Sequence, residues 1–100
     1  MSISRDTLEL NCSSDKIFDA LRTLNLRGFK VSKTDVSNRL VVLKTSMGLL
    51  SWGETVEVTV MPFAGGCSVS LRSSSNHPLN ITSSTSTPIR KLVEYLQRLC

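Results

Sequence analysis

In the segment ETVEVTV, residues 54–60, polar and apolar side chains alternate from Thr55 to Val60, and this pattern constrains the fold most. Successive side chains of a strand point to opposite faces, so the three valines share one face and the threonines and the second glutamate share the other. Residues 67–73, CSVSLRS, repeat the pattern after Gly65–Gly66. The two segments predict an antiparallel hairpin with one buried face and one face open to water.

Two further segments have apolar residues at the spacing of an amphipathic helix. The first begins at Ser13 or Ser14 and is expected to continue to Gly28, because glycine often follows a helix end. The second is TPIRKLVEYLQRLC, in which Thr87 is suited to cap the helix and Pro88 to be its first residue. The remaining strands are expected at residues 3–11, 29–34 and 39–45, with a turn at 35–38.

An antiparallel sheet with one apolar face needs a cover, and two amphipathic helices separated by four strands supply it. We therefore predict a two-layer α+β fold of order β-α-β-β-β-β-α, with an antiparallel sheet of four to five strands and both helices on one face. The chain has 100 residues, which suffices for one core but not for two, so residues 1–100 are expected to form a single domain. A small closed barrel, the alternative, would leave the apolar stripe of the last helix uncovered.

This order of elements resembles the helix-grip and TATA-box-binding-protein-like folds, in which a curved antiparallel sheet wraps a C-terminal helix. A closer resemblance rests on residues 51–54, SWGE, and 72–73, RS, which are similar to a motif in a family of small, largely uncharacterised bacterial domains. The resemblance covers about half of the chain and implies no established activity. Members of that family often have an acidic residue, a glycine and an asparagine before the last helix, where this chain has TSSTST.

The formal net charge is +4, and the basic residues are scattered singly apart from the adjacent pair Arg90–Lys91. A nucleic-acid patch usually shows clustered cations or interleaved aromatic residues, and the outward positions of the predicted hairpin carry no aromatic residue. We therefore do not expect the chain to bind nucleic acid. The longest uninterrupted apolar run is residues 40–43, far short of the ~20 residues of a membrane span, so no membrane span is expected.

Three cysteines, Cys12, Cys67 and Cys100, are spread along the chain without the close pairing of a zinc or redox motif. We expect thiols rather than a disulfide framework, with Cys67 in the core and Cys100 as a terminal thiol. The first residues show no basic-then-apolar signal pattern. Together these features predict a reducing, cytoplasmic location.

Motifs for catalysis or metal binding are missing from the sequence. His77 is the only histidine and lies beside a proline, without the marker of a nucleophile and its base. Glu54 and Glu57 are three residues apart in a strand, so they point to opposite faces and cannot share a site. We expect no metal, no cofactor and no enzymatic activity. An enzyme acting on an anionic substrate near residues 85–91 would have to use His77 as its base.

Two segments are candidate binding sites. In the first, Met47, Leu49, Leu50 and Trp52 line an apolar groove between sheet and helix, or else simply close one end of the core. The second is a phosphate or carboxylate site at the free amides of the last helix. Its residues are Thr85, Ser86, Thr87, Arg90 and Lys91.

The serine- and threonine-rich segment 73–88 that leads into this second site is otherwise a connection that ends in a helix cap, because every helix start has free amides. The leading prediction for function is a non-catalytic binding or protein-interaction module that uses the apolar groove or an exposed sheet edge. One alternative is a helix-grip-like carrier of a small apolar ligand, for which so short a chain leaves little volume. Another is an anion-binding domain that uses the last helix. The partner is then a protein or a small molecule, and edge strands could also pair two chains into a homodimer.

Overall fold

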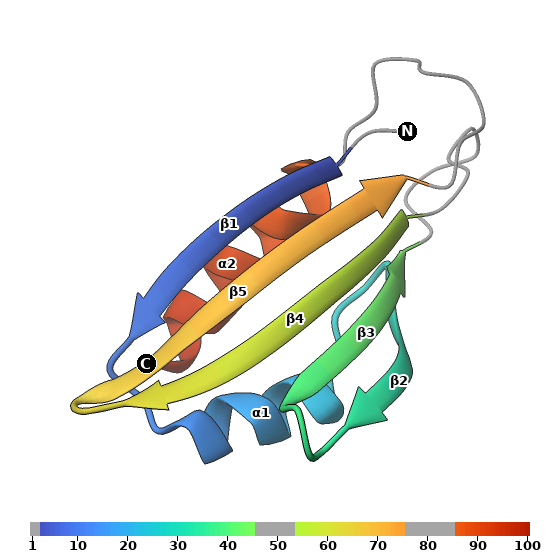
Figure 1. Cartoon of the computed structure of the whole chain (residues 1–100). Helices are drawn as coiled ribbons and strands as arrows, with labels where there is room; N and C mark the ends of the chain where they lie inside the picture. Colours follow the sequence, from blue (N-terminus) through green and yellow to red (C-terminus); the bar gives the residue numbers. More distant parts are fainter. Residues whose placement is uncertain (1–2, 46–53, 76–85) are drawn as a thin grey trace.

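A five-stranded antiparallel sheet forms one layer of the molecule and two helices form the other (Figure 1). The computed structural model describes residues 3–45, 54–75 and 86–100. The predicted α+β class and order of elements are confirmed. In chain order the elements are β1 (Ile3–Leu10), α1 (Ser14–Arg22), β2 (Phe29–Asp35), β3 (Leu40–Thr45), β4 (Glu54–Phe63), β5 (Gly66–Ser75) and α2 (Ser86–Leu99).

The strands lie in the order β1-β5-β4-β3-β2, and every neighbouring pair is antiparallel. Strands β2 to β5 follow one another as a meander, in which each strand pairs with the next in the chain. Strand β1 is added beside β5, so the first and last strands of the sequence are neighbours (Figure 1). This arrangement leaves β1 and β2 as the edges of the sheet.

The core lies between the sheet and the helices, and strand alternation decides which side chains enter it. The valines of β4 are at most 1% exposed, as the hairpin pattern predicts, and Cys67 is fully buried in the same layer. We call the face of the sheet that lies against the helices the inner face. Each helix packs three buried side chains against it. These are Ile17, Phe18 and Leu21 from α1 and Ile89, Leu92 and Leu96 from α2.

Helix α1 is shorter than predicted, because it ends at Arg22 rather than near Gly28. At the C-cap, the Thr23 backbone N–H and hydroxyl both donate to the carbonyl of Asp19, at 3.1 and 2.8 Å. A threonine that bonds its own preceding turn competes with helix continuation. Gly28 takes a φ of 89° in the turn before β2, so its role is in that turn.

Helix α2 begins at Ser86, which places Thr87 and Pro88 within its first turn. The prediction that Thr87 caps this helix is therefore wrong by at least one position. Proline remains compatible with this place, because the first-turn amides have no partner within the helix. The predicted apolar stripe is confirmed, since Ile89, Leu92 and Leu96 are buried.

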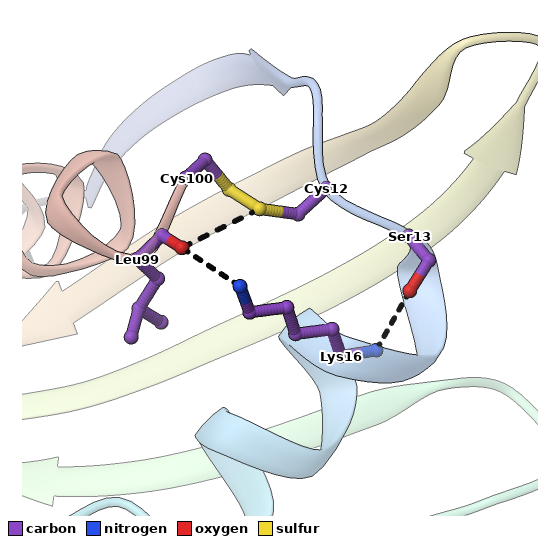
Figure 2. The surroundings of a disulfide bond; sticks show 5 residues. All are labelled: Cys12, Ser13, Lys16, Leu99 and Cys100. Carbon is purple, nitrogen blue, oxygen red and sulfur yellow. Dashed lines mark hydrogen bonds between the residues drawn. A yellow bond between two sulfur atoms is a disulfide. The ribbon is translucent and has the colours of Figure 1, made fainter.

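A disulfide joins Cys12 to Cys100, so the prediction that all three cysteines are thiols is wrong (Figure 2). The end of α2 lies beside the connection between β1 and α1, which brings together two residues 88 positions apart. Sequence spacing carries no signal for a pairing over such a separation. Disulfides are typical of oxidising compartments, so the cysteines no longer support a reducing location.

The same junction is tied by a hydrogen bond between the two helices. The Lys16 ammonium of α1 donates to the backbone carbonyl of Leu99 across 3.0 Å, and the Cys12 sulfur lies 3.6 Å from the same oxygen (Figure 2). The last carbonyls of a helix have no partner within it, so a lysine is well suited to this place. The disulfide and Lys16 thus fasten α2 to the start of α1.

Candidate functional site

Three polar side chains are buried on the inner face, at the end of the sheet where β3 stops and β4 begins. Thr45 is 5% exposed, Glu54 9% and Ser73 0%. In the part of the chain that the structure describes, they are the only buried polar or charged residues. We call them the Glu54 cluster. A buried carboxyl group is costly unless it finds partners, and such groups gather at functional sites.

Strand alternation places this cluster on the inner face. Glu54 lies two residues before Val56, and Thr45 and Ser73 each lie two residues after the last inward leucine of their strands. The register sets Thr45 directly opposite Glu54, while Ser73 is opposite Val56. The inner face is therefore apolar along most of the sheet and polar at the end where β3 stops and β4 begins.

The hydrogen bonds of the cluster leave the Glu54 carboxyl weakly partnered. The Ser73 hydroxyl donates to Oε2 of Glu54 across 3.5 Å, which is long for a bond to a carboxylate. The Glu54 backbone N–H donates to Oγ1 of Thr45 across 3.1 Å, which engages the backbone and not the carboxyl. Within residues 3–45, 54–75 and 86–100, no ion pair includes Glu54. A carboxylate accepts about four hydrogen bonds, so capacity remains for a donor.

Burial raises the pKa of Glu54 above its ordinary value of 4.5, and the Ser73 hydrogen bond offsets part of this rise. Glu57 differs, because it lies on the opposite face of the same strand and pairs with Arg72 across 3.1 Å. The prediction that Glu54 and Glu57 point to opposite faces is thus confirmed. The two carboxyl groups offer a matched comparison of a buried and an open site on one strand.

The raised pKa of Glu54 predicts a pH-dependent stability. The folded state holds the proton more tightly than the unfolded state, so the free energy of unfolding should fall as pH rises from 4.5 through the raised pKa. Urea denaturation across this range measures the fall. The variant Glu54→Gln should lose that part of the pH dependence, and Glu57→Gln should keep it. Equal pH profiles for the wild type and Glu54→Gln would contradict the assignment.

The residues predicted as an apolar groove lie outside the described part of the chain: Met47, Leu49, Leu50 and Trp52. Thr85 and His77 lie outside it as well, while Ser86 and Thr87 belong to the first turn of α2. Arg90 and Lys91 are exposed neighbours on α2. The structure thus neither assembles nor excludes these two predicted sites.

The Glu54 cluster was not among the predicted sites, although a signal for it exists. The two-residue step from Glu54 to Val56 already places the carboxyl on the apolar face. The sequence does not show that a glutamate at the start of a strand is covered rather than open to water. That depends on how the strand ends align in the sheet.

An open depression of about 520 Å³ lies elsewhere, between α1 and the turn that joins β2 to β3. Arg39 of that turn pairs with Asp15 across 2.7 Å and stacks over the ring of Phe18, with its guanidinium carbon 5.3 Å from the ring centroid. The charges that line the depression are mixed in sign, and the best placed of them already pair with each other. This arrangement fastens the turn to the helix, and we assign no ligand to it.

Among the described residues, no group of three metal-ligand side chains comes together. None of the described helices is long and apolar enough to cross a membrane. The thiol of Cys67 is buried, and burial raises its pKa, which disfavours the nucleophilic thiolate. The Glu54 cluster is therefore the strongest candidate site in the described part of the chain.

Solved structures with this architecture come from helix-grip proteins. A START superfamily protein from Mycobacterium smegmatis matches with a TM-score of 0.61 and 8% sequence identity, over 98% of this chain and 99% of that one. A norcoclaurine synthase point mutant from Thalictrum flavum, in complex with a transition-state analogue, matches with a TM-score of 0.59 and 14% identity, over 98% and 92% of the two chains. At such identities the likeness shows the fold alone, and it agrees with the helix-grip topology.

Neither a family model nor a curated protein matches the chain. The resemblance of residues 51–54 and 72–73 to a bacterial family therefore stays a prediction. The helix-grip topology, in contrast, is supported by the neighbours and by the observed order of strands.

Proposed function

We propose that this protein is a non-catalytic binding module that holds a small, largely apolar ligand against the inner face of its sheet, next to the Glu54 cluster. The observation that carries the proposal is the Glu54 carboxyl, which is 9% exposed and has a single long hydrogen bond from a described side chain. Ligand sites are commonly apolar with a few well-placed polar groups. The START-like neighbours fit such a use of the fold.

The closeness of the core packing limits the size of the ligand. Leu43, Val56 and Leu71 are the inward residues next to the cluster on the three central strands, and each is at most 1% exposed. The middle of the inner face is therefore filled, and a ligand must bind at its polar end. A hydrogen-bond donor on the ligand would meet Glu54, and its apolar part would extend away from the carboxyl.

The burial of Ser73 supports a non-catalytic role. Its hydroxyl is the described nucleophile nearest to a carboxyl base, but the residue is 0% exposed and cannot meet a substrate. A nucleophile has to reach the reacting atom as well as its base. One structural neighbour, norcoclaurine synthase, is an enzyme. Its sequence identity of 14% is too low to indicate a shared activity.

Pairing of a partner strand or a second copy at a sheet edge is a further proposal, and it favours β1. Edge β2 has a bulge between Val31 and Lys33, a feature that hinders pairing with another strand. Edge β1 has a continuous eight-residue register with β5. Size-exclusion chromatography with light scattering tests this proposal, and a monomer at all concentrations would reject the homodimer.

A neutral apolar probe with one N–H donor, N-phenyl-1-naphthylamine, tests the ligand site. We expect its fluorescence to rise on binding to the wild type and its affinity to fall about tenfold in Glu54→Leu, since a hydrogen bond to a charged group contributes about 1.5–3 kcal/mol. Glu54→Gln keeps an acceptor and should lose less.

Glu57→Gln is the matched control, because it changes a carboxyl on the same strand but on the opposite face. It should bind the probe as the wild type does. Equal affinities of Glu54→Leu and Glu57→Gln, or no rise in fluorescence with the wild type, would reject the inner-face site. Circular dichroism of each variant establishes that a loss of binding is not a loss of folding.

A further inference from the structure

Two pairs of like charges face each other directly across neighbouring strands. Arg5 of β1 is opposite Arg72 of β5, and Lys30 of β2 is opposite Lys44 of β3. Directly opposed side chains of a sheet lie about 5 Å apart at Cβ, and like charges at that distance destabilise the pairing. Sheet stability alone does not favour such pairs, so they point to an anionic partner.

The register gathers these cations, together with Lys33, into two adjacent rows on the outer face of the sheet. One row runs across all five strands through Arg5, Arg72, Glu57, Val42 and Lys33. The next row runs through Ile3, Ser74, Thr55, Lys44 and Lys30. We call these two rows the basic strip.

The basic strip holds five cations and one carboxylate, so it carries a charge equal to the whole net charge of +4. Glu57, the carboxylate, is already paired with Arg72 across 3.1 Å. Strand spacing makes the strip about 19 Å long and about 7 Å wide. It is a narrow band of positive charge that crosses the strands.

Within the described residues neither helix covers the outer face, because both helices pack on the inner face (Figure 1). Arg5, Lys30, Lys33 and Lys44 are exposed. Beyond the strip the face becomes acidic, since Asp35 and Glu9 lie on it toward the tip of the hairpin between β4 and β5. Positive charge is therefore confined to one half of the outer face.

We propose that the basic strip binds the phosphodiester backbone of a nucleic-acid duplex without reading its bases. A long, narrow strip fits a linear array of phosphates, and lysine, arginine, serine and threonine are the side chains that commonly contact phosphate. The rows contain no aromatic residue for stacking on bases, so the contact is with the backbone. This revises the expectation from sequence, where the same cations are scattered and no clustering is visible.

A membrane surface fits the outer face less well. Membrane attachment usually combines cations with apolar side chains that enter the lipid. The exposed apolar residues of this face, Met61 at 61% and Phe63 at 46%, lie at the far end, where the nearest charge on the face is that of Glu9. The cations and the strongly exposed apolar side chains of the described part of this face are thus at opposite ends.

Fluorescence anisotropy with a labelled random-sequence duplex of about 20 base pairs, over a series of salt concentrations, tests the proposal. We expect binding at low salt and a slope of log K against log salt of about −3 to −4, since about 0.9 is lost for each neutralised phosphate. The double variant Lys30→Gln/Lys44→Gln should lower the affinity about tenfold and flatten the slope by about 2. Arg22→Gln/Arg98→Gln removes two exposed cations from the helices, outside the strip, and should bind as the wild type does.

The same variants have a second readout that does not depend on a ligand. Lys30→Gln removes a like-charge repulsion, so it should raise the Tm at low ionic strength, and the rise should vanish at about 0.5 M salt, where charges are screened. An equal loss of binding in the Arg22→Gln/Arg98→Gln variant would reject the strip. So would binding to anionic vesicles but not to duplex, or an affinity that does not change with salt.

Discussion

Reduction of the Cys12–Cys100 disulfide is expected to lower the free energy of unfolding by about 2–4 kcal/mol. The bond closes a loop over a sequence separation of 88 residues, so it removes much of the freedom of the unfolded chain. For a chain of 100 residues this corresponds to a drop in Tm of about 10–20 °C. Thermal denaturation with and without a reductant, followed by circular dichroism, measures it.

Two variants separate the bond from other effects of the reductant. Cys12→Ser/Cys100→Ser should have the Tm of the reduced wild type and should not respond to reductant. Cys67→Ala removes the buried thiol that stays outside the bond, and its Tm should still fall on reduction. An unchanged Tm in a wild-type sample in which three thiols react after reduction would show that the cross-link does not stabilise the fold.

The second large effect is expected for Gly66→Ala, with a loss of about 2–4 kcal/mol. A Cβ atom at this position would lie 1.9 Å from the carbonyl oxygen of Leu10 and 3.0 Å from its carbonyl carbon. Both atoms are backbone, so the end of β1 would have to move away from β5 to make room. Glycine is required here because another strand approaches its backbone closely.

Gly65→Ala is the matched control for this substitution. Gly65 has a φ of 94°, and a Cβ atom there would meet nothing within 4 Å. Only the conformational strain of the left-handed region remains, which costs about 1–2 kcal/mol. Urea denaturation compares the two variants, and amide hydrogen exchange near Leu10 should rise in Gly66→Ala alone. A larger loss in Gly65→Ala would contradict the role of the close approach.

Local periodicity was enough to predict much of the fold. The alternation in residues 54–60 and 67–73 identified the central hairpin and its buried face, because the two-residue period of a strand is visible in consecutive residues of the sequence. The helical spacing of Ile89, Leu92 and Leu96 likewise identified the buried stripe of α2. These features depend only on neighbours within a few positions.

The features that were missed depend on pairings between distant segments. Arg5 and Arg72, two like charges, lie opposite each other only because β1 pairs with β5. Cys12 and Cys100 form a disulfide only because the end of α2 lies beside the end of β1. Neither contact leaves a periodic trace in the sequence. The end of α1 was missed for a different reason, since the apolar spacing continues to Leu24 while the helix ends at Arg22 and Thr23 is its C-cap.

The addition of β1 to the far edge of the meander has a consequence for the order of folding. The pairings among β2, β3, β4 and β5 join segments that follow one another, so they close short loops. Each pair between β1 and β5 joins residues separated by more than half of the chain. Formation of such distant contacts is slow. We therefore expect a meander that assembles early, with the N-terminal strand docking late in the folding reaction.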